Sequence, residues 1–83
     1  MKEEFLKAVS SELKIIRIEN GDSQEELALK SKIATSTISK YETGKDDMSL
    51  YKIEQMLKPY NYTLSIFFTR VLAKMQNKKP KIV

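Results

Sequence analysis

The sequence contains no cysteine and no histidine. Without cysteine the chain can form neither a disulfide framework nor a thiolate metal site, and without histidine it lacks the commonest general base and the commonest zinc ligand. No apolar run approaches the length of a membrane span, and the first residues, MKEEFLKAV, lack the apolar segment of a secretory signal. We therefore expect a cytoplasmic protein with no metal site and no cofactor.

The residues that are present fit one small globular domain. The chain has 83 residues, of which 41% are hydrophobic and 31% are charged, a balance typical of folded rather than disordered proteins. A core of this size is marginal, so dimerisation would add stability. The net charge of +4 and the pI near 9.3 allow attraction to phosphate groups without establishing it, because lysine-rich surfaces are ordinary.

Four stretches have the residue spacing of amphipathic helices, namely 3–19, 23–31, 35–43 and 49–57. Ser23 and Glu26 match a capping box at the start of the second stretch, and Ser49 caps the fourth. Gly44 ends the third helix, and Pro59 marks the end of the fourth. The residues expected in the core of this helical part include Leu27, Ile33, Ile38, Leu50 and Ile53.

The apolar period changes after Asn61. Over residues 62–68 apolar and polar side chains alternate, which is typical of a strand. A lone strand cannot satisfy its own backbone groups, so we expect it to pair with the same strand of a second copy, through a dimer interface of Tyr62, Leu64, Ile66 and Phe68. The alternative is a strand folded back on its own domain. In either case we expect residues 1–69 to form the domain and residues 70–83 to form a flexible basic tail.

Two short helices separated by a tight break predict a helix-turn-helix. The segments LKIIR (13–17), SQEELALK (23–30), TSTISKYETG (35–44) and SLYKIEQML (49–57) resemble the lambda-repressor-like, or XRE, family. The resemblance implies an all-α, four-helix domain, to which the sequence adds a short C-terminal β-strand. LKIIR and YTLSIFF are also similar to the HipB type of antitoxin.

The resemblance to the XRE family also implies roles for individual residues. Gln24, at the start of the second helix, would donate to a DNA phosphate, and Lys45 would contact the backbone beyond the third helix. The third helix would enter the major groove and present to the base edges Thr35, Ser36, Thr37, Ser39 and Lys40. Arg17 and Glu42 would form a partly buried ion pair that ties this helix to the first. Outside this pattern, Gln24 and Lys40 would count as ordinary solvated residues.

Three positions depart from the family pattern, and one of them is Asp22, which replaces a usual apolar residue. Lys32 stands where the turn commonly has glycine, and a left-handed lysine there would cost about 1 kcal/mol. Ala34 replaces the usual capping serine, so Thr35 is the alternative cap, which would move the helix start by one residue.

These features predict a dimeric, sequence-specific transcription regulator that binds double-stranded DNA and represses its own operon. Its two reading helices would engage half-sites about 34 Å apart in a palindromic operator. One alternative is the antitoxin of a toxin–antitoxin pair, which would also bind a toxin protein. Another is a protein-interaction module that binds no DNA. We do not expect an enzyme, because no acid, base or metal cluster supports the Ser36–Lys40 pair.

Overall fold

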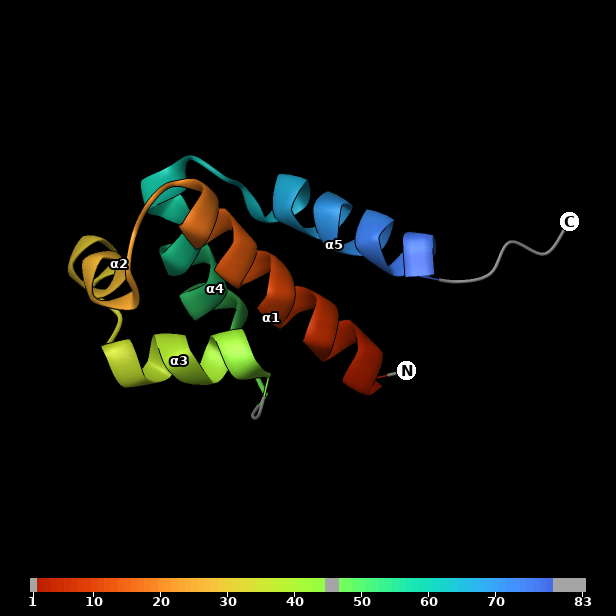
Figure 1. The fold of residues 1–83 in the computed structure, drawn as a ribbon, viewed down its shortest axis with the longest axis horizontal. Helices are drawn as coiled ribbons and strands as arrows, with labels where there is room; N and C mark the ends of the chain where they lie inside the picture. The colour runs from red at the N-terminus through yellow and green to blue at the C-terminus, as the bar shows by residue number, and fades with distance from the viewer. Residues whose placement is uncertain (1, 45–46, 79–83) are drawn as a thin grey trace, which may run out of the picture.

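The computed structural model describes residues 2–44 and 47–78, and all of the regular structure in these residues is helical. In chain order the elements are α1 (Lys2–Glu19), α2 (Gln24–Ser31), α3 (Thr35–Thr43), α4 (Leu50–Leu57), the 3₁₀ turn η1 (Lys58–Tyr60) and α5 (Leu64–Lys78). Figure 1 shows α1 and α5 side by side, with α2 and α3 at the other side of α1 and α4 behind it. No helix in this part of the chain is long and apolar enough to cross a bilayer.

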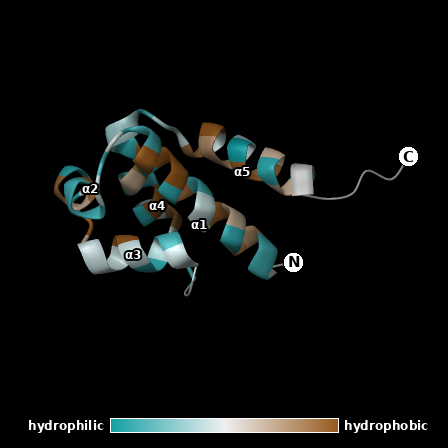
Figure 2. Ribbon diagram, in the orientation of Figure 1, coloured by the Kyte–Doolittle hydropathy of each residue, from teal (hydrophilic) through white to brown (hydrophobic). Residues whose placement is uncertain are grey.

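One hydrophobic core joins the five helices. Its most deeply buried side chains come from every helix, namely Val9, Ile16, Leu27, Ile38, Met56, Leu57, Phe67 and Val71. Figure 2 shows that α3 is mostly hydrophilic to neutral, with its hydrophobic part facing the rest of the molecule. The expected core residues Leu27, Ile38 and Ile53 are buried, and Ile33 is half-buried. The prediction for Leu50 is wrong, because its side chain is 58% exposed at the start of α4.

Gly44 brings α3 close to α1. Its left-handed backbone (φ 68°) ends the helix, and its N–H donates to the Lys40 carbonyl at 3.0 Å. A Cβ at this position would lie only 2.8 Å from Ser10 Oγ in α1. Glycine is favoured here because it adopts this conformation without strain, and because any Cβ would force Ser10 Oγ to move.

The C-terminal strand predicted for residues 62–68 is wrong, because α5 begins at Leu64. The pattern becomes helical once the window extends past Phe68, since the apolar side chains on its inner side recur at Leu64, Phe67, Val71 and Met75. Thr63 caps the helix by accepting from the Ile66 N–H at 3.1 Å. The part of the resemblance to HipB-type antitoxins that rested on a C-terminal strand is therefore not supported.

The four-helix count is wrong for the same reason. Helix α5 crosses the expected domain boundary at residue 70 and continues to Lys78, so residues 70–78 are helical rather than a tail. The remainder of the predicted tail, 79–83, lies outside the described residues.

Polar contacts hold α5 against α1. The buried carboxylate of Glu12 accepts from Arg70 Nε at 3.1 Å and lies 3.7 Å from Lys74 Nζ. Arg70 also donates to the Tyr62 hydroxyl at 2.5 Å and to Glu19 at 3.4 Å. The fifth helix is therefore anchored by both an apolar face and a charged edge.

Candidate nucleic-acid interface

Helix α2 begins with a complete capping box. The Glu26 N–H donates to Ser23 Oγ at 3.0 Å, and the Ser23 N–H donates to Glu26 Oε1 at 2.7 Å. At its other end Lys32 adopts the left-handed conformation (φ 61°, ψ 27°) and its N–H donates to the Ala28 carbonyl. Ser31 supports the turn by donating to the Leu27 carbonyl at 2.7 Å. Lys32, at the position where the family commonly has glycine, therefore has the left-handed backbone strain that was expected there.

Helix α3 begins at Thr35 without a side-chain cap. Ala34 has the extended backbone of an N-cap residue (φ −61°, ψ 142°), and its carbonyl accepts from the Thr37 and Ile38 N–H groups. Its methyl side chain offers no acceptor for the first amides of the helix. The alternative in which Thr35 caps the helix is wrong, because Thr35 is already its first helical residue.

The inner side of α3 fixes the helix to the domain. Ile38 is fully buried and Tyr41 is nearly so. The Tyr41 hydroxyl accepts from the Ser49 N–H at 2.8 Å, which ties α3 to the start of α4. These residues determine which side of α3 faces outward.

The outer side of α3 carries the five residues predicted to meet base edges. Ser36 and Lys40 are exposed, and Thr35, Thr37 and Ser39 are half-buried. None of these five side chains forms a hydrogen bond or ion pair with another described residue. By contrast, the hydroxyl of Thr43, at the end of the helix, donates to the Lys40 carbonyl at 3.1 Å. The outer side therefore presents four free hydroxyls and one ammonium group.

Gln24 lies beside the ion pair that anchors α3. Arg17 donates to both carboxylate oxygens of Glu42, at 2.7 and 2.9 Å, and these two side chains are almost completely buried. The Gln24 Nε2 donates to Glu42 Oε1 at 3.0 Å. The hydrogen bonds that Arg17 donates to Glu42 are the main reason that the pKa of Arg17 is raised above its ordinary value. The first residue of α2 and the end of α3 are thus held by one carboxylate.

A second polar cluster, which the sequence did not reveal, surrounds Asp22. Its carboxylate accepts from Lys30 Nζ at 2.8 and 3.0 Å and from the Tyr60 hydroxyl at 2.7 Å. The hydrogen bond from Lys30, followed by that from Tyr60, lowers the pKa of Asp22. Burial, followed by the hydrogen bond to Asp22, raises the pKa of Tyr60. Because Arg17 Nη1 donates to the Asp22 carbonyl at 2.7 Å, this cluster is continuous with the anchor of α3.

Lys45, the predicted backbone contact, lies outside the described residues. The described part of the chain contains no group of three or more side chains that could hold a metal ion. Among the described residues, the predicted contacts lie on the outer side of α3 and at the beginning of α2.

Comparisons with known proteins identify the type of domain. The Helix-turn-helix family model matches residues 13–67. A search of curated protein sequences finds no match.

The chain is also similar to solved structures of the restriction-modification controller protein C.Esp1396I. One point mutant of that protein is 28% identical, with a TM-score of 0.82 over 90% of this chain and 97% of the other. A second point mutant is 30% identical, with a TM-score of 0.77 over 86% and 95%. The tetramer of that protein, in complex with its natural 35 base-pair operator, is 29% identical, with a TM-score of 0.79 over 87% and 95%.

The family model covers most of the chain and includes the capped start of α2, the left-handed turn and all of α3. On these grounds the chain belongs to the helix-turn-helix family.

Proposed function

We propose that this protein is a sequence-specific transcription regulator that binds double-stranded DNA through α3 and represses its own operon. The observation that carries the proposal is the outer side of α3, where five polar side chains have no partner among the described residues. The solved neighbour in complex with its operator supports the same function.

The chemistry of α3 suits the major groove. Lys40 is exposed and can donate to guanine O6 and N7, whereas hydroxyls can donate or accept and so discriminate less. Gln24 uses one amide hydrogen on Glu42 and retains a second for a phosphate oxygen. Lys45 is proposed as a further phosphate contact, and the net charge of +4 favours approach to DNA.

The test is selection of bound duplexes from a random pool, followed by binding measurements with Lys40→Ala. We expect this variant to lose about 1–3 kcal/mol of discrimination at one base pair. Lys14→Ala is the matched control, because Lys14 is an exposed lysine on α1. Identical base preferences for the wild type and Lys40→Ala would exclude base reading by this residue. No enrichment of any duplex would favour a protein-interaction module.

We further propose that the protein dimerises through α5 rather than through a strand. Of the four residues predicted at the interface, Tyr62, Leu64 and Phe68 pack against the core of their own chain, and only Ile66 is exposed. Over residues 64–76 of α5, for which the structure describes the exposure of the side chains, the exposed ones form an uncharged strip of Ser65, Ile66, Thr69, Leu72, Ala73 and Gln76. Exposed surfaces without charge are typical of interface centres, and 31% of this chain is charged.

Sedimentation velocity tests the dimer. The variant with both Ile66→Lys and Leu72→Lys should be monomeric at concentrations at which the wild type is dimeric, because two buried ammonium groups would oppose association. Leu29→Lys is the control, since Leu29 is 82% exposed on α2 and lies outside the strip. A wild-type monomer, or a double variant that still associates, would contradict the proposed interface.

A further inference from the structure

The carboxylate of Glu42 accepts hydrogen bonds from two different helices. Two of these bonds come from Arg17 on α1, at 2.7 and 2.9 Å, and a third comes from Gln24 Nε2 on α2, at 3.0 Å. The Glu42 side chain is only 2% exposed, so these contacts lie almost out of reach of water and are correspondingly strong. The carboxylate is therefore held in place in the free protein.

Gln24 takes its orientation from this carboxylate. An ionised carboxylate accepts hydrogen bonds and donates none, so the Gln24 amide must turn its nitrogen, rather than its oxygen, toward Glu42. One hydrogen of that nitrogen is used on Glu42 Oε1. The other hydrogen points away from the carboxylate and is the one left for a phosphate oxygen.

A glutamine that is already held binds a phosphate with a smaller loss of entropy. Glutamine is among the side chains that lose most rotamer freedom when they are fixed. Ordering one such side chain during association weakens affinity by about twofold to tenfold. In this protein the contact with Glu42 orders Gln24 before association.

We propose that Glu42 is a positioning residue for DNA binding, which holds the Gln24 amide ready for a backbone phosphate while it anchors α3 through Arg17. One carboxylate would thereby fix the phosphate contact at α2 relative to the base contacts on α3. This inference rests on the proposed function, in which Gln24 is assigned to a phosphate.

Two double variants separate this role from that of the ion pair. The amide background combines Arg17→Met with Glu42→Gln, and the leucine background combines Arg17→Met with Glu42→Leu. Both remove the two buried charges together, which proteins tolerate far better than the loss of one partner. The side chain of Glu42→Gln can still form a hydrogen bond with the Gln24 amide, whereas that of Glu42→Leu cannot. An effect of the ion pair on α3 is therefore common to both backgrounds.

Gln24→Ala is then made in each background and in the otherwise unchanged chain, and affinity is measured for a duplex that the wild type selects. In the unchanged chain Gln24→Ala should weaken binding about tenfold, as expected for a hydrogen bond to a charged group. The loss should be similar in the amide background. In the leucine background it should be about threefold or less, because the Gln24 side chain is no longer ordered in advance.

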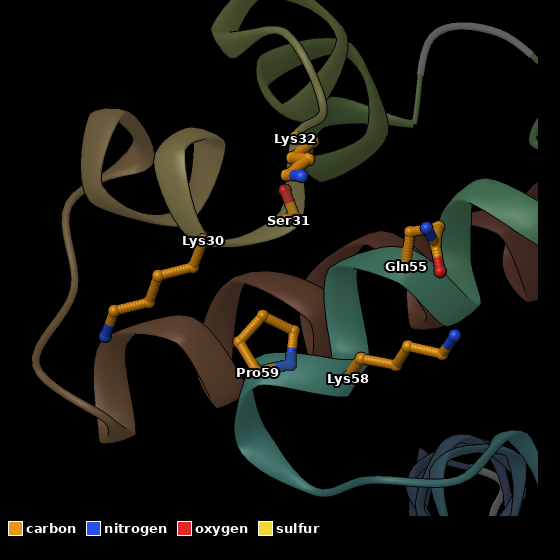
Figure 3. A pocket seen from close by; sticks show the side chains of 6 residues that line it. All are labelled: Lys30, Ser31, Lys32, Gln55, Lys58 and Pro59. Carbon is orange, nitrogen blue, oxygen red and sulfur yellow. The ribbon is translucent and has the colours of Figure 1, made fainter.

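Gln55→Ala is the matched control. Gln55 is half-buried, as Gln24 is, but it lies on α4 at a hollow beside the end of α2, whereas Gln24 begins α2. Figure 3 shows Gln55 near Lys58 at this hollow. The Gln55 Oε1 has no hydrogen-bond donor among the described residues. Gln55→Ala should therefore leave duplex affinity unchanged in all three chains.

A measurement on the free protein tests the positioning without DNA and without any variant. The order parameter of the Gln24 side-chain amide, measured by NMR relaxation, should be high in the unchanged chain and in the amide background. It should fall in the leucine background. A value below about 0.6 in the unchanged chain would mean a mobile amide and would overturn the proposal.

The binding results distinguish a failure of this inference from a failure of the proposed function. If the wild type selects a duplex but Gln24→Ala causes equal losses in the amide and leucine backgrounds, only the positioning role is refuted. The same holds if Gln24→Ala causes no loss in the unchanged chain, since Gln24 then contacts no phosphate. A wild type that selects no duplex refutes the proposed function, and the positioning role with it.

Discussion

Arg17 and Glu42 meet through two parallel hydrogen bonds, from Nε to Oε2 at 2.7 Å and from Nη2 to Oε1 at 2.9 Å. The pair joins the end of α1 to the end of α3, and the exposed fractions of the two side chains are only 9% and 2%. A planar, bidentate pair of this kind fixes orientation as well as distance. The orientation of α3 relative to α1 therefore depends on this contact.

Glu42→Ala should lower the free energy of unfolding by about 3–5 kcal/mol, because it leaves the Arg17 charge buried without its partner. Urea denaturation measures the change. Glu19→Ala is the control, since the Glu19–Arg70 pair is exposed and such pairs contribute about 0–1 kcal/mol. Equal losses in the two variants would show that the buried pair contributes no more than a surface pair.

We expect the protein to lose stability in acid as the Asp22 carboxylate is protonated. Its pKa in the folded protein lies below the ordinary value, so the folded state binds fewer protons than the unfolded state while the pH lies between the two pKa values. Stability from this group is complete above about pH 5 and is lost as the pH falls through about 4 and below.

Asp22→Asn removes this titration and keeps an oxygen that can accept from Lys30 and Tyr60. The difference in unfolding free energy between wild type and variant should be constant from neutral pH to about pH 5 and should shrink at lower pH. Urea denaturation at a series of pH values measures it. A difference that stays constant down to about pH 2 would assign the acid sensitivity to other carboxylates.

Lys32→Gly should stabilise the protein by up to about 1 kcal/mol, because Lys32 is held at a φ of 61° that glycine adopts without strain. The greater freedom of glycine in the unfolded chain keeps the gain below the full relief of strain. Lys58→Gly, at a residue with right-handed helical backbone, should instead be destabilising. Destabilisation by Lys32→Gly would mean that the lysine side chain contributes more than its backbone costs.

The sequence predicted α1 to α4 because each has an apolar face and a recognisable end, such as the Ser23 capping box or Gly44. The prediction failed at α5 because apolar and polar residues alternate over residues 62–68. This window is too short to distinguish the two-residue period of a strand from the 3.6-residue period of a helix. The buried pair of Phe67 and Val71, four residues apart, is the signal that identifies the helix. Thr63 as an N-cap was a second signal.

Contacts between residues far apart in the chain were harder to predict from the sequence. The pairing of Arg17 with Glu42 was expected only from the family resemblance, since 25 residues separate them. The hydrogen bond between Tyr60 and Asp22 spans 38 residues and follows no local pattern. Nothing in the sequence indicated that Gln24, predicted to donate to a phosphate, also donates to Glu42, because only the packing of α2 on α3 brings the two side chains together.

Ala34→Ser should stabilise the start of α3. The backbone at residue 34 already has N-cap geometry, so a hydroxyl there can accept from the Ser36 or Thr37 N–H without rearrangement. We expect a gain of about 0.5–1 kcal/mol in the free energy of unfolding, measured with urea. Ser49→Ala makes the reverse change at α4, where Ser49 Oγ accepts from the Lys52 N–H, and should cost about 1 kcal/mol. If Ser49→Ala is destabilising while Ala34→Ser gives no gain, the first amides of α3 are already satisfied by solvent, and the missing cap costs this helix nothing.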